Sequence, residues 1–391
     1  MKNLRPLCLV VAFAASANGT EDFFPVMPWN HVPHDTNVIA KIRDCGFTVA
    51  GFAQPGTLKF CEQYGLKAIV YDARTASYDW TNVDEAQARK NVRSLVDETG
   101  QSKAAYGYYL RDEPRGNFFK GLAIVSSLVQ EMAPGKWPYI NLFPNYAEPW
   151  QMDAEKYDAY VEKFVKICRP TQLSYDHYAL MDDGSLRGSY WQNLEQMRAA
   201  AVRHQLPFWN IVLATAHFNY REPTAADMRF QVYSTLAYGG RGISYFTYFA
   251  PQVGNYRNAP IDQFGNPTPA WGVLQNINLQ IQKLAPTLLK LKSDAVYHFG
   301  AIPQGCHGPE TNSLVSAIGG EIAAGDFTHE DGNRYVMLVN KDLIKSVHCA
   351  PQFRSSQKSL KFVCPYSGQL LNYEGEYLWL APGSGRLLKL E

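Results

Sequence analysis

The stretch YGYYLRDEP, from Tyr106 to Pro114, indicates the fold of this chain. Its first five residues are aromatic, apolar or glycine, and tyrosine-rich runs of this kind favour β-strands. The run leads directly into Arg111, Asp112 and Glu113 and then stops at a proline. We therefore predict a buried strand whose carboxyl end carries adjacent charged groups.

Seven further runs of this type recur along the chain, and helix-like segments such as 84–99 and 189–205 lie between them. The predicted strands are 23–30, 47–53, 67–73, 104–113, 138–144, 172–178, 207–216 and 242–249. Eight strand–helix units in about 270 residues are typical of an α/β fold of the (β/α)8 TIM-barrel type. The alternative is a doubly wound open sheet, which usually carries a glycine-rich phosphate loop after its first strand. Residues 28–37, PWNHVPHDTN, contain no glycine.

The pattern changes near residue 293. From there, short strands such as EIAAGDFT and RYVMLVNK alternate with Gly, Asn, Asp and Pro. Between these two segments, residues 331–333 read Asp-Gly-Asn, a typical hairpin turn. We expect residues 18–292 to form the barrel and residues 293–391 to form a small antiparallel β-sandwich domain.

The first residues have the organisation of an export signal. Basic Lys2 and Arg5 precede an apolar run from Leu7 to Ala15, and residues 15–17, Ala-Ser-Ala, match a small-x-small cleavage site. We expect residues 1–17 to be a signal peptide and the mature protein to be secreted, either periplasmic or extracellular. A buried first helix is the alternative. No later segment has about 18 consecutive apolar residues, so we expect no membrane span.

The charge balance gives no indication of an anionic partner. Lys and Arg total 37, and Asp and Glu total 36, so we expect neither nucleic acid nor an anionic membrane surface as a partner. Neutral partners are the better expectation. The sequence does not indicate an oligomeric state.

Six cysteines follow the predicted signal peptide: Cys45, Cys61, Cys168, Cys306, Cys349 and Cys364. Their spacing matches no structural zinc site, and we expect neither a metal nor another cofactor. Export permits disulfides, and Cys349 with Cys364 is the first candidate pair because both belong to one strand-rich region. Free buried thiols are the alternative.

In a TIM barrel, the active residues lie at the carboxyl ends of the strands. At these ends the sequence combines carboxylates, neutral hydrogen-bonding groups and aromatic rings with few cations. A phosphate site favours lysine or helix-terminal glycine, and a metal site needs a tighter set of His and carboxylate ligands. The mixture therefore indicates a neutral, polyhydroxylated ligand such as a carbohydrate.

Glu113 is the candidate general acid for cleavage of a glycosidic bond, a reaction that needs two carboxyl groups. In a partly desolvated pocket, the adjacent Asp112 raises the pKa of at least one of the two groups, which keeps a proton available near neutral pH. Arg111 acts in the opposite direction. The alternative is that these three residues form an ordinary ion-pair cluster in a loop.

The second carboxyl group has three candidates. Asp176 ends the sixth strand between aromatic neighbours. Glu222 follows the seventh strand and precedes Pro223 and Thr224, where it could equally serve a helix N-terminus. Asp112 could instead orient a substrate group that acts as an internal nucleophile.

Eight further residues at or near the strand ends are candidate substrate contacts, because they supply ring faces or hydrogen-bonding groups. They are Trp29, Asn141, Tyr175, His177, Tyr178, His217, Arg221 and Tyr248. For the two histidines, the alternative is a core position with satisfied hydrogen bonds.

The barrel resembles the glycoside hydrolases of the large retaining clan that includes the family 42 β-galactosidases. In that clan, strand four ends in an Asn-Glu-Pro-like motif that carries the acid/base, and here residues 112–114 read Asp-Glu-Pro. Residues 224–249 resemble the seventh helix and eighth strand of the clan. The segments YVMLVNKD and LAPGSGRLLKL resemble the C-terminal β domain that often follows such barrels. The resemblance covers most of the mature chain and implies that Glu113 is the acid/base.

Two features depart from the pattern of the clan. The clan places its nucleophilic glutamate at the end of strand seven, where this chain reads VLATAHF, and no acid follows until Glu222. Aspartate at residue 112 is instead similar to hexosaminidase-like enzymes, in which an Asp-Glu pair follows strand four and the aspartate orients the acetamido group of the substrate. That similarity implies Tyr178 or Tyr175 as a helper.

The sequence thus predicts a secreted glycoside hydrolase that cleaves oligo- or polysaccharides with Glu113 as general acid/base. One alternative is a substrate-assisted hydrolase that uses Asp112 and Glu113. Another is a non-catalytic carbohydrate-binding barrel, which the missing acid after strand seven favours. A polysaccharide lyase is disfavoured, because the strand ends carry few cations that could neutralise a uronate.

Overall fold

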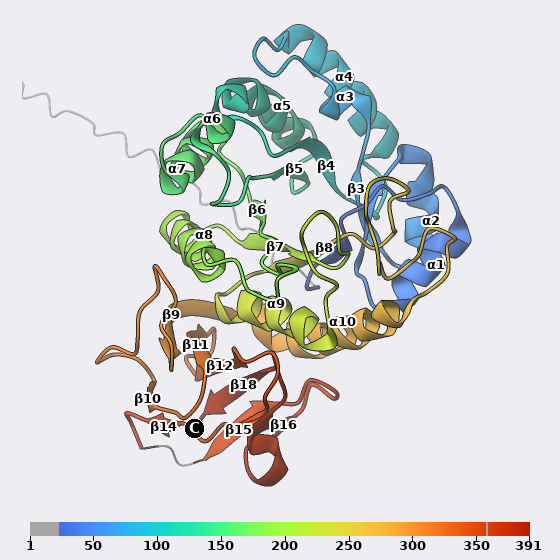
Figure 1. Ribbon diagram of the computed structural model, residues 1–391. Helices are drawn as coiled ribbons and strands as arrows, with labels where there is room; N and C mark the ends of the chain where they lie inside the picture. Colours follow the sequence, from blue (N-terminus) through green and yellow to red (C-terminus); the bar gives the residue numbers. More distant parts are fainter. Residues whose placement is uncertain (1–22, 357–358) are drawn as a thin grey trace, which may run out of the picture.

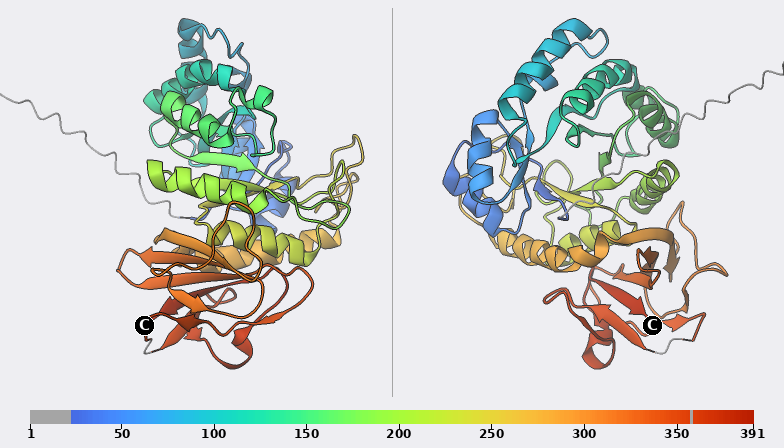
Figure 2. Two further views of the ribbon diagram at one scale, coloured as in Figure 1. Left: turned by 60° about the vertical axis from the view of Figure 1, so that its left-hand side comes forward. Right: turned by 180° about the vertical axis from the view of Figure 1, so that it is seen from behind.

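The computed structural model describes residues 23–356 and 359–391 (Figure 1). The predicted signal peptide, residues 1–17, lies outside the described residues. The described chain has an α/β part and an antiparallel β part that lie against each other (Figure 2). Among the helices of these residues, none is long and apolar enough to cross a lipid bilayer.

The α/β part is built on eight parallel strands, each of which overlaps a range predicted from the sequence. They are β1 (Val26–Pro28), β2 (Val49–Ala53), β3 (Lys67–Val70), β4 (Ala105–Asp112), β5 (Trp137–Asn141), β6 (Leu173–Asp176), β7 (Phe208–Leu213) and β8 (Gly242–Phe246). They form two four-stranded sheets with the orders β1-β8-β7-β6 and β2-β3-β4-β5. The predicted alternation of eight strands with helices is confirmed.

Isolated bridges between parallel segments connect the two sheets at both junctions. One joins His31, which follows β1, to Phe52 of β2, and the other joins Leu142, which follows β5, to Tyr175 of β6. At the second junction, Leu142 N donates to Ser174 O at 2.8 Å. The strands therefore follow one another in chain order, which gives a TIM-barrel-like arrangement.

The helices of the α/β part lie on the outer side of the strands (Figure 1). The longer ones are α1 (Thr36–Asp44), α4 (Glu85–Thr99), α5 (Phe119–Met132), α7 (Tyr157–Cys168), α8 (Tyr190–His204), α9 (Ala225–Ala237) and α10 (Pro269–Leu288). The short ones are α2 (Leu58–Gln63), α3 (Ala73–Ala76) and α6 (Pro149–Met152), and 3-10 turns occupy η1 (Pro55–Thr57) and η2 (Gly116–Phe118). A further 3-10 turn, η3 (Gly375–Leu378), belongs to the antiparallel part. Helices α4 and α8 confirm the two helical segments expected from the sequence. The Asp84 carboxylate caps α4 by accepting from Ala86 N at 2.9 Å.

Large apolar side chains fill the space that the strands enclose. Met27, Val49, Ile69, Trp137 and Trp209, from five different strands, belong to one buried cluster. The rings of Trp137 and Trp209 are 4.7 Å apart. The interior is therefore a packed core, and only the strand ends are left for chemistry.

The antiparallel part contains one six-stranded sheet and two two-stranded sheets. The larger sheet has the order β16-β15-β18-β12-β11-β9, with β9 (Leu291–Phe299), β11 (Ile322–His329), β12 (Arg334–Asn340), β15 (Leu360–Val363), β16 (Leu370–Asn372) and β18 (Gly385–Leu390). The smaller sheets pair β10 (Val315–Ala317) with β14 (Gln352–Phe353) and β13 (Val347–His348) with β17 (Trp379–Leu380). The expected hairpin is confirmed, because His329 N donates to Asn333 O at 2.9 Å between β11 and β12. A sandwich and a domain boundary at residues 292–293 stay predictions.

Helix α9 lies between the two parts. All of its residues except Ala225 and Arg229 are buried. It contacts β7 on one side and β11, β12 and β18 on the other. A Cβ atom added to Gly325 of β11 would lie 2.0 Å from the carbonyl oxygen of Ala237, so the strand and helix backbones are in direct contact. One helix thus contributes to the packing of both parts.

The cysteines do not form the disulfide that the sequence suggested first. All six described cysteines, Cys349 and Cys364 included, are free thiols. The two thiol groups face different neighbours, since Cys349 lies against Tyr373 and Cys364 against Ser367. The pairing is therefore wrong for this structure, and the alternative of free thiols applies.

We expect Gly325→Ala to lower the free energy of unfolding by about 3 kcal/mol, because the added methyl group overlaps the α9 backbone. Gly319→Ala is the matched control, since no heavy atom lies within 4 Å of a Cβ atom added there. For the control we expect a change below about 0.5 kcal/mol. Urea denaturation measures both, and equal stability of the two variants would contradict the close approach.

Candidate active site

The carboxyl groups of two adjacent residues lie where β4 ends. We call this end of the barrel-like arrangement, where the carboxyl ends of the strands lie, the mouth. Asp112 is the last residue of the strand, and Glu113 follows it with φ +43°. This left-handed conformation is uncommon for a residue other than glycine. Glu113 N donates to Asn141 O at 2.8 Å, and Tyr160 OH donates to Pro114 O at 2.8 Å. These bonds hold the strained turn in place.

The side-chain amide of Asn141, at the end of β5, connects the carboxyl groups of β4 and β6. Its Nδ2 atom donates to Asp112 Oδ1 at 3.0 Å and to Asp176 Oδ1 at 2.8 Å. The two carboxyl oxygens are therefore no farther apart than the combined length of these two bonds. Asn141 and Asp176 are buried, so water does not compete for the shorter bond.

A directed series of hydrogen bonds orients the Asn141 amide. Trp29 Nε1 donates to Tyr139 OH at 3.1 Å, Tyr139 OH lies 3.2 Å from Ser174 Oγ, and Ser174 Oγ donates to Asn141 Oδ1 at 2.9 Å. An indole N–H can only donate, so the Tyr139 hydroxyl is free to direct its own proton toward Ser174. Since Oδ1 of Asn141 accepts from Ser174, Nδ2 faces the carboxyl groups.

Burial raises the pKa of all three carboxyl groups. The pKa of Asp112 rises to about 6 through burial, against the hydrogen bond from Asn141 and the charge of Arg111. The pKa of Glu113 rises to about 7 through burial and then through the charge of Asp112. Burial and the charges of Glu113 and Asp112 raise the pKa of Asp176 well above its usual value. At least one of the three groups therefore holds a proton near neutral pH.

Aromatic rings flank the carboxyl groups. Burial raises the pKa of the Tyr178 phenol, and the charges of Asp176, Asp112 and Glu113 raise it further. Its ring lies 5.4 Å from that of Phe246, which in turn lies 5.7 Å from a ring of Trp29. Of the residues expected at the site, the structure thus brings Trp29, Asp112, Glu113, Asn141, Asp176 and Tyr178 together.

Glu222 lies apart from this group. Its side chain is 54% exposed, and its carboxylate lies 3.5 Å from the Arg257 guanidinium. Thr224 and Asp227 form a capping box at the N-terminus of helix α9, in which each side chain accepts from the backbone N–H of the other residue. The capping role considered for Glu222 is therefore wrong. Within the described residues, no hydrogen bond or ion pair joins Glu222 to Glu113.

Tyr175 and His177 are fully buried and do not reach the mouth. Side chains alternate along a strand, so Tyr175 points away from the face that carries Asp176. The Tyr175 ring packs 6.4 Å from Phe208, and His177 Nε2 lies 3.3 Å from Ser189 Oγ. Neither side chain can contact a substrate in this structure. His177 lies in the core, as in the alternative that we considered, but only its Nε2 atom has a hydrogen-bond partner among the described residues, and its Nδ1 atom has none.

Arg221 and Tyr248 stabilise the loops around the strand ends. Arg221 donates to Asp227 Oδ1 at 2.5 Å and to Ser185 O at 3.1 Å. The buried Tyr248 hydroxyl accepts from Trp271 Nε1 at 2.9 Å. These bonds occupy the polar groups that were candidates for substrate contact.

Two residues that the sequence analysis did not identify also lie near the mouth. Arg187 has its guanidinium 4.0 Å from the centre of the Tyr146 ring, and it donates to Tyr220 OH at 3.3 Å and to Tyr178 O at 3.2 Å. Burial and then the charge of Asp176 raise the pKa of Tyr146. Tyr146 could have been found, because it follows the fifth strand closely. Nothing in the loop pattern distinguishes Arg187.

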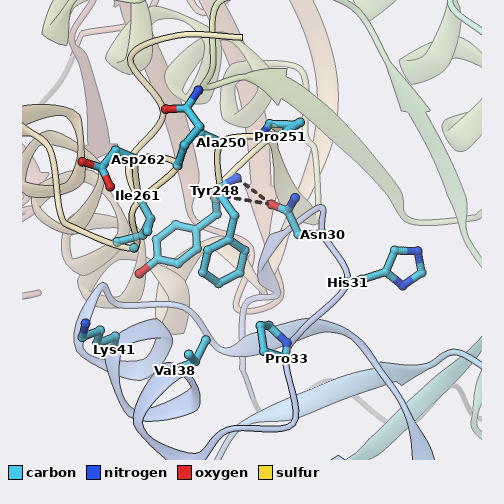
Figure 3. Close-up of a pocket in the computed structure, with 13 residues that line it drawn as sticks. Asn30, His31, Pro33, Val38, Lys41, Tyr248, Ala250, Pro251, Ile261 and Asp262 are labelled. Carbon is cyan, nitrogen blue, oxygen red and sulfur yellow. Dashed lines mark hydrogen bonds between the residues drawn. The ribbon is translucent and has the colours of Figure 1, made fainter. Parts of the chain in front are cut away.

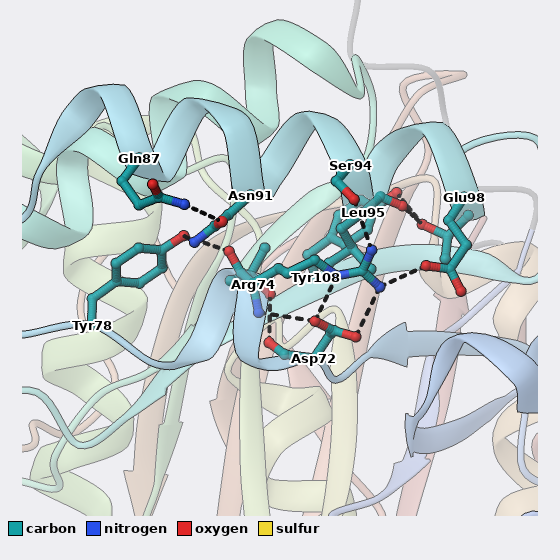
Figure 4. Close-up of polar contacts among 11 residues, drawn as sticks. Asp72, Arg74, Tyr78, Gln87, Asn91, Ser94, Leu95, Glu98 and Tyr108 are labelled. Atoms are coloured by element: carbon teal, nitrogen blue, oxygen red, sulfur yellow. Dashed lines mark hydrogen bonds and ion pairs between the residues drawn. The ribbon is translucent and has the colours of Figure 1, made fainter.

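Asp72 follows β3 but has a structural role (Figure 4). Its carboxylate accepts from Arg74 N at 2.9 Å and pairs with the Arg74 guanidinium at 2.8 Å. Arg74 also pairs with Glu98 of α4 at 2.6 Å. Asp72 therefore caps α3 and links it to α4, so a carboxylate at a strand end is not by itself a site.

A cavity of about 460 Å³ lies beside the mouth, between the loops that follow β1 and β8 (Figure 3). Its lining includes His31, Lys41, Tyr248, Ile261 and Asp262. None of the three carboxyl groups described above lines it. The cavity is therefore a neighbour of the candidate site and does not contain it.

The described residues contain no group of three or more His, Cys, Asp or Glu side chains placed to hold a metal ion. Two of the three carboxyl groups at the mouth accept instead from the Asn141 amide. A group of carboxyls with raised pKa values beside aromatic rings is suited to general acid/base chemistry.

No family model matches the chain, and no curated protein matches it in sequence. Solved structures do share its fold. A family 5 glycoside hydrolase from Bacteroides vulgatus has a TM-score of 0.60 at 12% identity, over 94% of this chain and 88% of the other. A second structure, described only as a glycoside hydrolase, has a TM-score of 0.58 at 12% identity, over 94% of this chain and 92% of the other.

The polyextremophilic β-galactosidase of the Antarctic haloarchaeon Halorubrum lacusprofundi has a TM-score of 0.51 at 10% identity, over 71% of this chain. The chain spans 59% of that protein and 60% of the β-galactosidase of the psychrophilic Marinomonas ef1. At such identities the likeness establishes the fold alone. The chain is therefore similar in fold to TIM-barrel-like glycoside hydrolases.

We expect Asn141→Asp to lower the free energy of unfolding by about 2 kcal/mol at pH 8, because it removes two buried donors and adds a fourth carboxyl group. Carboxyl groups whose pKa is raised by folding stabilise the fold only while they are protonated. The loss should therefore grow as the pH rises from about 4, the unfolded value, through about 7. Denaturation at pH 5 and pH 8 measures it, with the exposed Asn117→Asp as control. A loss that does not depend on pH would contradict the arrangement.

Proposed function

We propose that this protein is a glycoside hydrolase with Glu113 as general acid/base. The observation that carries the proposal is the group of three carboxyls, Asp112, Glu113 and Asp176, with raised pKa values at the mouth. Hydrolysis of a glycosidic bond needs one protonated and one ionised carboxyl group. The likeness in fold to glycoside hydrolases supports the proposal.

Glu113 suits the acid role because both causes that act on its pKa in the described part of the chain, burial and the charge of Asp112, disfavour its charged form. Among the described residues, no side chain donates a hydrogen bond to its carboxyl group, whereas Asp112 and Asp176 both accept from Asn141. A donor stabilises the ionised carboxylate. Burial is the main cause of the raised pKa of Asp176, and the charges of Glu113 and Asp112 add to it. When Glu113 carries the proton, one of these two charges is absent, so Asp176 ionises at a lower cost as nucleophile or base.

A substrate-assisted hydrolase is the second candidate, because Asp112 also accepts from Asn141 and adjoins the proposed acid. In that scheme, Asp112 orients an acetamido group of the substrate, whose oxygen attacks the anomeric carbon. Asp176→Asn separates the two schemes, since it removes the second carboxyl group of the first scheme and leaves the nucleophile of the other intact. Near-normal turnover of N-acetylhexosaminides by that variant would favour substrate assistance.

We also propose that the protein acts outside the cytoplasm, on the basis of the signal-like pattern in residues 1–17. Polysaccharides and their fragments are then its accessible substrates. Mass spectrometry of the mature N-terminus tests the export step, with cleavage after Ala17 expected.

We expect Glu113→Gln to lower kcat by about 10³-fold on any oligosaccharide that the wild type cleaves, because the variant has no proton to give the leaving oxygen. Glu222→Gln, the control, should stay within about threefold of wild type, because its side chain is exposed and separate. Product formation is followed by chromatography. Sugar binding without turnover by both wild type and Glu113→Gln would instead support the non-catalytic barrel.

The wild-type kcat/KM should fall as the pH rises through about 7, because Glu113 loses its acidic proton with that pKa. Asp112→Asn removes a negative charge that raises this pKa, so the alkaline limb should move to lower pH, by about one unit. The exposed Asp97→Asn should leave the limb in place. A shift to higher pH in Asp112→Asn would mean that Glu113 is not the titrating acid.

A further inference from the structure

Phe218 presents an aromatic ring to solvent beside the mouth. The residue is 69% exposed in the loop after β7, and its backbone has φ +46°. A left-handed conformation is costly for a bulky residue. An exposed aromatic ring also contributes little hydrophobic stabilisation to the fold. The fold therefore maintains two unfavourable features at one position.

Four hydrogen bonds hold this loop against the loop after β8. Phe218 N donates to Asn255 Oδ1 at 2.7 Å, and Asn255 Nδ2 donates to Phe218 O at 2.8 Å. Beside them, Ala216 N donates to Arg257 O at 3.2 Å, and Arg257 N donates to Ala216 O at 3.0 Å. The backbone that carries the exposed ring is thus held in place before any ligand arrives.

A continuous series of rings connects Phe218 to the carboxyl groups. The His217 ring lies 5.0 Å from the Phe218 ring and stacks on Tyr256 at 4.9 Å with an angle of 8°. On its other side, His217 lies 5.7 Å from Tyr178, which flanks the three carboxyls. Burial lowers the pKa of His217, so its ring, which is only 2% exposed, is neutral near pH 7 and connects the exposed rings to Tyr178 inside the fold. The rings lead outward from the candidate acid to Phe218.

We propose that Phe218 and the half-buried Tyr256 form an outer subsite that stacks on a sugar ring of an oligosaccharide, away from the bond that is cleaved. The inference rests on the proposed function and adds a substrate class to it, namely neutral chains of several sugars. Sugar rings have apolar C–H faces that pack on aromatic rings. A ring on a backbone that is already held in place loses less entropy on ligand binding than a ring on a mobile loop.

The experiment compares Phe218→Ala, Phe218→Trp and wild type on 4-nitrophenyl glycosides and on gluco-, manno- and xylo-oligosaccharides of two to six units. On the longest chain that the wild type cleaves, we expect Phe218→Ala to lower kcat/KM about tenfold, mainly by raising KM. A change of this size is expected when one apolar contact with the substrate is lost. On the shortest substrate, the change should stay below about twofold. Phe218→Trp should restore activity on long chains. Phe264→Ala, at an 89% exposed ring farther along the loop after β8 and without a ring contact or hydrogen bond to Phe218 or Tyr256 among the described residues, is the matched control and should resemble wild type.

Each outcome separates the subsite from the catalytic proposal. Equal losses on short and long substrates, or no loss on long ones, would overturn the subsite and leave the hydrolase. Cleavage of monosaccharide glycosides alone would do the same. If the wild type cleaves nothing, the proposed function fails, and calorimetric titration with the hexasaccharides decides the subsite. Binding that Phe218→Ala weakens would then support it, and unchanged or absent binding would overturn it. Thermal unfolding confirms that each variant is folded.

Discussion

The hydrogen bonds from one amide group, that of Asn141, determine the geometry of the candidate site. Its two N–H groups reach Asp112 on one neighbouring strand and Asp176 on the other. Buried carboxyl groups repel one another when ionised, and a shared donor offsets part of that cost. Glu113 lacks such a donor among the described residues, so burial and the charge of Asp112 raise its pKa to about 7 without an opposing hydrogen bond.

The amide can serve in this way only because the interior of the barrel-like arrangement is closely packed. Its orientation depends on Ser174, Tyr139 and Trp29, which come from three separate parts of the chain. Tyr139 and Trp29 lie among other aromatic rings, and Ser174 is fully buried, so an unmade hydrogen bond would be costly at each of them. The apolar core therefore supports the polar site directly, and the left-handed turn at Glu113 is held by the same neighbouring strand.

Much of the fold could be read from the sequence, because a buried parallel strand needs a short apolar run and an outer helix needs its own spacing. The position of Asp112 and Glu113 followed from the same pattern. The orientation of Tyr175 and His177 did not, since one step along a strand moves a side chain to the opposite face, and the exact strand bounds decide which face that is. The contact between Glu222 and Arg257 joins two loops that are distant in the sequence.

The sequence by itself determined the alternation of eight strands with helices, the antiparallel strands that follow and the pair of acids at the end of the fourth strand, because all of these depend on local composition. Only the tertiary structure decided that Asp176 joins the pair, that Asn141 links them and that the thiols of Cys349 and Cys364 stay apart. These outcomes depend on which side chains are brought within hydrogen-bonding distance. That distance is set by how neighbouring strands are aligned, and no single segment of the sequence contains this information.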